Sequence, residues 1–252
     1  MDISVLTNTI LVTALVFIRI STFFLLLPVI NFIKLPVVIR ILLALAMSLF
    51  LKVNFVDAGV KITTDYDFIG MIVSEVINGA SLAFGVFIAF ATFQFAGRII
   101  DFQMGLAVAN QIDPITNAQA PLVGTLLFLL GSLVFILEGG VSIFIKVLAL
   151  SLQTYPPGVM FSALSYEALV SSVGVMFSLS IVLISPVIVT LFLIDIAMAF
   201  SARFMPQMNV FILSLPLKVA VGFCVLAMVV TWMRPIMERI FNIMLTYWYG
   251  IL

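Results

Sequence analysis

Histidine is absent from the 252-residue sequence, and cysteine occurs once, at position 224. Without histidine there is no Ser-His or Cys-His dyad, no HExxH zinc site and no histidine proton relay. A single cysteine excludes an internal disulfide framework, and because Cys224 lies in an apolar run we expect it to be a small core residue. The sequence also has no phosphate-binding glycine loop and no metal-ligand cluster, so it predicts no catalytic, metal or cofactor site.

Charged residues are scarce as well. They make up 9% of the chain, whereas 64% of the residues are hydrophobic and the mean hydropathy is +1.36. A soluble domain carries roughly a quarter charged residues. The sequence therefore predicts an all-α integral membrane protein. Its 11 basic and 11 acidic residues balance, which indicates neither nucleic-acid binding nor an acidic substrate.

The apolar residues form long runs that we expect to be helices. Residues 36–51 are short for a membrane span, because a spanning helix needs about 20 apolar residues. The last long run is expected to end at Arg234-Pro235, and the tail that follows carries Tyr247 and Trp248, which suits the membrane interface. The expected helices cover residues 3–33 with a break at Pro28, 36–51, 68–97, 121–137, 141–152, 168–194 with an interruption at Pro186, and 215–233.

Several of these runs carry a charge near the middle. Each such charge would cost about 2.5 to 3.5 kcal/mol if it faced lipid at the centre of the bilayer. We therefore expect the helices to pack against other protein, or to surround water, over most of their surface. The charges in question are Arg19, Glu75, Lys146, Asp195 and Lys218.

Some charged residues are spaced so that they can form pairs. Arg98 and Asp101 are three residues apart on one helical face, where they can form an ion pair. Asp195 and Arg203 are eight apart and can share a face, and an antiparallel hairpin would bring Lys218 back towards Asp195. Such a cluster is either a proton relay or ion site, or a structural bridge that fixes a hairpin or binds a neighbouring subunit. We favour the structural bridge.

The helical pattern fails between residues 98 and 124. Small residues cluster there, Asp113-Pro114 signals a turn, and Pro121 is placed to open the next helix. Irregular backbone at membrane depth is tolerated only where protein or a water-filled cavity receives it. The stretch is therefore either a plug that closes a pore or a loop buried for structural reasons. Its candidate plug residues are Met104, Gly105, Leu106, Ala107, Val108, Ala109, Asn110, Ile112, Asp113 and Pro114.

The same stretch resembles a known family. GRIIDFQMGLAVANQIDPITNAQAPLVGTLL, Gly97 to Leu127, is similar to the signature of the FliR/SctT family of flagellar and injectisome export-gate proteins. The segments from Phe17 to Leu49 and from Leu183 to Gly222 are similar to the family's opening helices and its C-terminal hairpin. Gln103-Met104-Gly105-Leu106 favours the flagellar branch. Glu138-Gly139-Gly140 departs from the Asn-Gly-His of many flagellar members.

The resemblance implies a fold of bent helical hairpins. Residues 1–167 would be a FliP-like region that includes the plug at about 105–120, and residues 168–252 a FliQ-like hairpin with a C-terminal tail. One copy of the chain would join FliP and FliQ in a helical pore, with the turn from Arg203 to Ser214 facing FlhB. The assembly would lie in the bacterial inner membrane, within the flagellar basal body.

The resemblance also implies a non-enzymatic role without cofactors. Unfolded flagellar proteins would pass through the pore, driven by the proton motive force and an associated ATPase. Three alternatives remain open. They are an SctT-like injectisome subunit, a secondary transporter with Asp195 and Arg203 at its substrate site, and an intramembrane aspartyl enzyme that uses Asp101 and Asp195.

Overall fold

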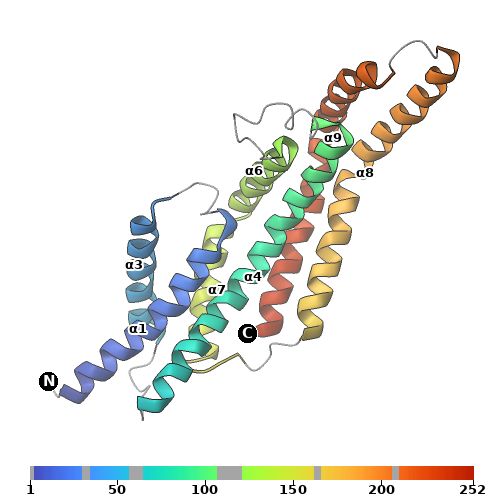
Figure 1. Ribbon diagram of the computed structural model, residues 1–252. Coiled ribbons are helices and arrows are strands. Elements are labelled where there is room, and N and C mark those ends of the chain that lie inside the picture. The colour runs from blue at the N-terminus through green and yellow to red at the C-terminus, as the bar shows by residue number, and fades with distance from the viewer. Residues whose placement is uncertain (1–2, 30–34, 57–64, 107–120, 162–165, 206–209) are drawn as a thin grey trace. The chain divides into compact units, whose positions relative to one another are not determined.

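The computed structural model describes residues 3–29, 35–56, 65–106, 121–161, 166–205 and 210–252, and all of its regular elements there are α-helices. Five of them are long and apolar enough to cross a membrane, and the bent pair α6–α7 would be a sixth span. The prediction of an all-α membrane protein is confirmed. The helices are α1 (Ile3–Leu26), α3 (Val37–Phe55), α4 (Asp65–Gln103), α6 (Leu122–Leu137), α7 (Gly140–Thr154), α8 (Tyr166–Phe204) and α9 (Val210–Ile251) (Figure 1).

Several expected boundaries are wrong, including that of α8, which passes through Pro186 and continues beyond residue 194 to Phe204. Helix α3 is 19 residues long because it continues through Lys52 to Phe55. Helix α4 continues six residues past Gly97, and α9 runs through both Pro216 and Pro235 without a break. A proline removes one backbone hydrogen bond, but ending a helix in an apolar environment would leave several groups unpaired. Continuing the helix is therefore the less costly choice.

The break between α6 and α7 lies where the sequence places it. Gly139 has φ +76°, a left-handed conformation that residues with a side chain rarely adopt, and the two helices meet at 70°. The start of α6 also agrees with the prediction, since Pro121 immediately precedes it and the Pro121 carbonyl accepts a hydrogen bond from the Thr125 N–H at 2.9 Å.

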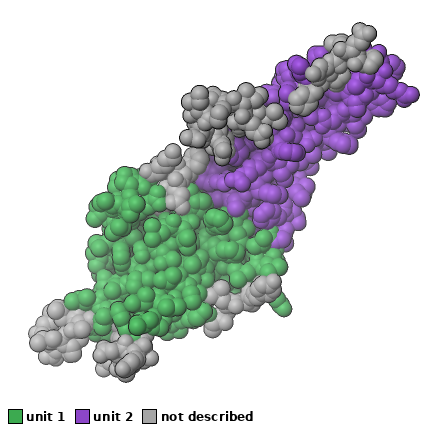
Figure 2. All heavy atoms as spheres, viewed as in Figure 1, with its two compact units in different colours: residues 1–89, 136–173, 242–252 green, residues 90–135, 174–241 purple. Residues whose placement is uncertain are grey.

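The chain packs as two compact units (Figure 2). Unit 1 contains residues 1–89, 136–173 and 242–252, and unit 2 contains residues 90–135 and 174–241. Helices α4, α6, α8 and α9 each have residues in both units. This division by packing differs in kind from the division by resemblance into 1–167 and 168–252, which stays a prediction.

In unit 1 the end of α9 is fixed to α4 by two aromatic side chains. The Tyr247 hydroxyl donates to the Ser81 carbonyl at 3.0 Å, and the Trp248 indole N–H donates to the Leu82 carbonyl at 2.9 Å. Gly85 allows this approach, because a Cβ there would lie 2.9 Å from Cδ1 of Tyr247. The expected interfacial position is therefore wrong for Tyr247 and Trp248, which are buried, whereas Tyr249 is exposed.

In unit 2 the core is aromatic. Five phenylalanine rings from α4, α6 and α9 form a cluster with centroid separations between 5.0 and 6.1 Å. Cys224 is not part of this core, contrary to expectation, because it faces outward from α9. Its apolar neighbours in sequence belong to a helix that is exposed on much of its surface. The clustered rings are Phe90, Phe93, Phe128, Phe135 and Phe241.

Candidate functional site

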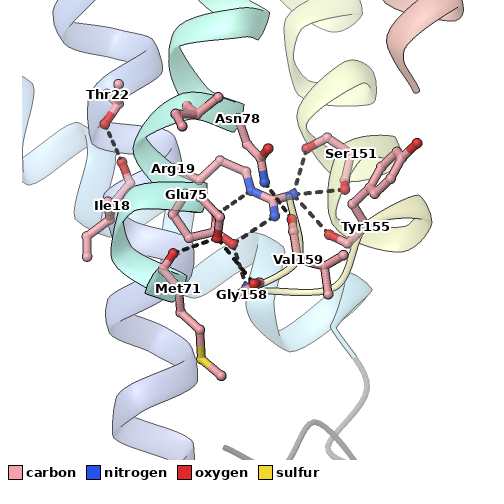
Figure 3. Close-up of polar contacts among 12 residues, drawn as sticks. Ile18, Arg19, Thr22, Met71, Glu75, Asn78, Ser151, Tyr155, Gly158 and Val159 are labelled. Carbon is pink, nitrogen blue, oxygen red and sulfur yellow. Dashed lines mark hydrogen bonds and ion pairs between the residues drawn. The ribbon is translucent and has the colours of Figure 1, made fainter. Parts of the chain in front are cut away.

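Arg19 and Glu75 form a buried ion pair in unit 1 (Figure 3). The Arg19 Nε donates to Glu75 Oε2 at 2.5 Å and its Nη2 donates to Oε1 at 2.9 Å. The remaining Nη1 donates to the main-chain carbonyls of Ser151 at 2.8 Å and Tyr155 at 3.1 Å. Both charged side chains have zero exposure. The guanidinium thus joins α1 to α4 and to the end of α7.

The same cluster fixes the segment that follows α7. The Gly158 N–H donates to Glu75 Oε1 at 2.6 Å. Asn78 donates to the Val159 carbonyl at 2.8 Å and accepts from the Phe161 N–H at 3.0 Å. Within the described part of the chain, no buried side-chain nitrogen or oxygen lacks a hydrogen-bond partner. Since these contacts occupy the charged groups, the cluster acts as a structural joint.

Asp101, in unit 2, holds the start of α6. Its carboxylate accepts hydrogen bonds from the main-chain N–H groups of Val123 at 3.0 Å and Gly124 at 3.3 Å. The first N–H groups of a helix have no partner inside the helix, and the positive end of the helix dipole favours a carboxylate. The expected pair with Arg98 is therefore wrong. Asp101 is 5% exposed and turned towards α6, whereas Arg98 is exposed.

Helices α4 and α6 touch backbone to backbone beside this cap. A Cβ at Gly97 would lie 2.7 Å from the main-chain carbon of Val123 and would overlap Gly124. Only two glycines permit this contact, and it brings the N–H groups of α6 within reach of Asp101. Helices α4 and α6 are therefore in direct main-chain contact at this joint.

A second polar contact lies at the last residue of α4. The Gln103 side-chain amide donates to Asp195 Oδ2 at 3.2 Å, and the other carboxylate oxygen of Asp195 is paired with Lys218. The predicted return of Lys218 to Asp195 across the α8–α9 hairpin is thus confirmed. Arg203 is exposed near the end of α8, and Asp195 pairs with Lys218 rather than with it. The shared face expected for Asp195 and Arg203 stays a prediction.

The next two residues rest on α9. The Met104 side chain is fully buried against Gly222, where an added Cβ would lie 3.1 Å from its Cγ. Gly105 has φ +77° and faces the Leu215 side chain. Leu215, Lys218 and Gly222 are spaced i, i+3 and i+7, so they share one face of α9. We call these three residues the α9 cradle.

The candidate plug residues are divided by what the structure describes. Met104, Gly105 and Leu106 directly follow α4, and Leu106 is half-buried. Both ends of the central stretch are fixed within unit 2, one by the α9 cradle and the other by Asp101. The candidates that lie outside the described residues are Ala107, Val108, Ala109, Asn110, Ile112, Asp113 and Pro114.

Sequence reasoning missed several residues of these clusters. Gln103 carried a signal, since it is a polar residue at the end of an apolar helix, directly before Met-Gly. The carbonyls of Ser151 and Tyr155 and the N–H of Gly158 carried none, because any residue supplies main-chain groups. Lys146, expected to need a protein partner, is exposed on α7. In the described residues, no group of three acidic or cysteine side chains gathers as a metal site.

The chain is similar to known proteins over most of its length. The family model described as bacterial export proteins, family 1, matches residues 10–244. The flagellar biosynthetic protein FliR of Bacillus subtilis is 31% identical over 91% of the chain and 90% of that protein. FliR of Aquifex aeolicus is 30% identical over 82% of the chain and 81% of its own length. The surface presentation of antigens protein SpaR of Shigella sonnei is 28% identical over 81% and 78%.

Proposed function

The chain belongs to the bacterial export proteins of family 1, and we propose from this membership that it is a subunit of the flagellar type III protein export gate. The observation that carries the proposal is the similarity to flagellar FliR across nine-tenths of both chains. The gate is a structural channel component, so the chain binds and passes unfolded protein rather than transforming a substrate. An injectisome role is the second candidate, favoured by the similarity to SpaR.

The lengths of α8 and α9 support a hetero-oligomer. They contain 39 and 42 residues, which at 1.5 Å per residue is about 60 Å each. The hydrocarbon core of a bilayer is only about 30 Å thick. Large apolar side chains are exposed along both helices, including Phe192, Phe204 and Trp232. Lipid cannot cover that whole length, so other protein chains are needed to cover the rest.

The partners that fit this need are FliP and FliQ, with FlhB at the turn between α8 and α9. The assembly would lie in the bacterial inner membrane, within the flagellar basal body, and would hold one copy of this chain. Co-purification from membranes followed by mass measurement of the intact complex tests this proposal. We expect FliP and FliQ to be present at higher copy number than this chain. A stable monomer that lacks all three partners would contradict it.

Within that complex, residues 105–120 form the plug. The fixed ends of the stretch support this role, because a stopper must be held at a defined place in the pore. Removal of residues 106–120 should leave the complex assembled but make membranes leaky to small ions. Conductance of the purified complex in planar bilayers measures the leak, and mass measurement establishes assembly. If the assembled complex without residues 106–120 conducted no more ions than the unmodified complex, the plug would be ruled out.

The export role itself is tested in cells that lack the chain. Such cells should make no filament and secrete no hook or filament protein, and the gene supplied in trans should restore both. If flagella form normally while effector secretion is lost, the injectisome role is correct instead. If the purified chain alone accumulates a small solute in vesicles, it is a secondary transporter and both export roles are wrong.

A further inference from the structure

The last residues of α4 are held by the hairpin of α8 and α9 through contacts unlike those of the neighbouring α4–α6 joint. We propose that Asp195 and the α9 cradle form a releasable contact with Gln103, Met104 and Gly105, which we call the latch. The latch holds the end of α4 while the gate is closed and must break when the gate opens. The consequence for export rests on the proposed function, whereas the grip itself rests on the contacts alone.

The polar half of the latch is one chain of contacts, from Gln103 to Asp195 to Lys218. The Lys218 and Asp195 side chains are 16% and 38% exposed, so water can replace either partner when they separate. Gln103 contributes a single neutral donor at 3.2 Å. A contact of this kind stabilises a position but costs little to break.

The apolar half of the latch is the packing of a methionine side chain against a glycine of α9. Met104 fills the space that the missing side chain of Gly222 leaves on α9, and Leu215 covers Gly105, which has no side chain of its own. A methionine side chain is unbranched and adapts to new surroundings. The end of α4 can therefore leave α9 without any main-chain hydrogen bond being broken between the two helices.

The α4–α6 joint differs at each of these points. Its polar contact runs from a carboxylate to two main-chain N–H groups, Asp101 is 5% exposed, and glycine backbones touch at Gly97 and Gly124. Separation there would expose unpaired amides. When α4 moves, α6 should therefore move with it, and the α9 cradle should be the side that opens.

A covalent lock tests the release. Because the Met104 Cγ lies 3.1 Å from an ideal Cβ on Gly222, the two Cβ atoms lie near the ~3.5–4.5 Å separation that a disulfide requires. Met104→Cys and Gly222→Cys are combined in a Cys224→Ser chain, which removes the competing thiol. We expect the disulfide to form in the assembled complex, secretion of flagellar proteins to be lost, and a reductant to restore it.

The control for the lock is the Cys224→Ser chain treated with the same oxidant, which contains no thiol and should secrete as before. Full cross-linking with undiminished secretion would overturn the proposal, since the end of α4 would then have no need to leave α9. Failure of the disulfide to form in an assembled complex would overturn it too, because Met104 would not lie on Gly222 at rest.

A second pair of variants weakens the grip. Gln103→Leu removes the donor, and Gln103→Glu places a second carboxylate against Asp195. Both should leave assembly intact and raise the bilayer conductance of the complex, with Gln103→Glu the leakier. Gln153→Leu, which alters an exposed glutamine of α7, is the matched control and should stay tight.

These outcomes separate the latch from the function on which it rests. If the complex that lacks residues 106–120 conducts ions and the complexes with either Gln103 variant do not, the proposal of a latch is wrong and the proposal of a plug is kept. If the deletion is tight in an assembled complex, the plug is wrong. If the chain supports no flagellar secretion, the export role is wrong, whatever the disulfide does.

Discussion

Two ion pairs of similar chemistry differ in burial and in the number of hydrogen bonds around them. The Arg19–Glu75 pair in unit 1 has no exposure and is surrounded by further hydrogen bonds to Ser151, Tyr155 and Gly158. The Asp195–Lys218 pair in unit 2 is partly exposed and has one additional contact, from Gln103. Both place charge within long apolar helices, so burial and the number of partners distinguish them, not sequence context.

The difference teaches which joint is permanent. A buried charge that loses its partner has nothing to replace it, so such a pair does not open while the protein stays folded. A partly exposed pair exchanges its partner for water at small cost. The first kind suits the fixed frame of a membrane subunit, and the second suits a contact that must open and close.

The largest expected effect comes from breaking the pair of unit 1. Glu75→Gln leaves the Arg19 charge buried with neutral partners, and losing one member of a buried pair costs about 3–5 kcal/mol. We expect the variant chain to be scarce in membranes and absent from the purified complex. Immunoblots of membranes against an unmodified strain measure this.

Arg19→Lys serves as the control for Glu75→Gln, since it keeps the charge but cannot span both the carboxylate and two carbonyls. It should give an intermediate level of chain. If Glu75→Gln accumulated as well as the unmodified protein, the pair would be dispensable and the comparison would fail on its unit 1 side.

A smaller effect is expected at Asp101, which is buried but has no charged partner among the contacts it makes. Asp101→Asn keeps an acceptor for one N–H and turns a donor towards the other, so the loss is that of a helix cap, about 1–2 kcal/mol. Hydrogen exchange should show faster exchange at Val123 and Gly124, while Ser132, further along α6, stays as before. Unaltered protection at both amides would show that the cap does not stabilise α6.

The smallest effect on stability is expected in the hairpin. Asp195→Asn should lower the free energy of unfolding by less than about 1 kcal/mol, because the pair is partly exposed. Glu238→Gln, which breaks the exposed pair with Arg234, is the matched control with a similarly small effect. Asp195→Asn alone should raise bilayer conductance. If Asp195→Asn and Glu238→Gln gave equal conductance, the Asp195–Lys218 pair would have no role in closing the pore beyond that of an ordinary exposed pair.

The sequence predicted those features that depend on residues close together in the chain or on composition. Apolar runs predicted the membrane class, the glycine after Glu138 predicted the break before α7, and the hairpin predicted the Asp195–Lys218 contact. Each follows from local chemistry or from a short turn that reverses the chain. The plug, the partners and the division into FliP-like and FliQ-like regions came from the resemblance and stay proposals.

Contacts that no side-chain pattern marks were not predictable. Asp101 pairs with main-chain groups 22 and 23 residues away, which no side-chain pattern marks, so the nearer Arg98 was the only visible partner. Tyr247 and Trp248 suited a membrane interface by residue type, yet Gly85, which makes room for them, lies 162 and 163 residues earlier in the chain. Pro186 and Pro235 suggested breaks because local preference does not include the cost of unpaired amides in an apolar environment.

The arrangement around Arg19 has a consequence for biosynthesis. Glu75 is 56 residues further along the chain, and the carbonyl of Ser151 is 132 residues further. A ribosome therefore delivers α1 to the translocon with an uncompensated guanidinium, which would cost about 2.5 to 3.5 kcal/mol at the centre of a lipid bilayer. We therefore expect α1 to stay beside the insertion machinery until α4 is made, so that the two enter the bilayer as a pair.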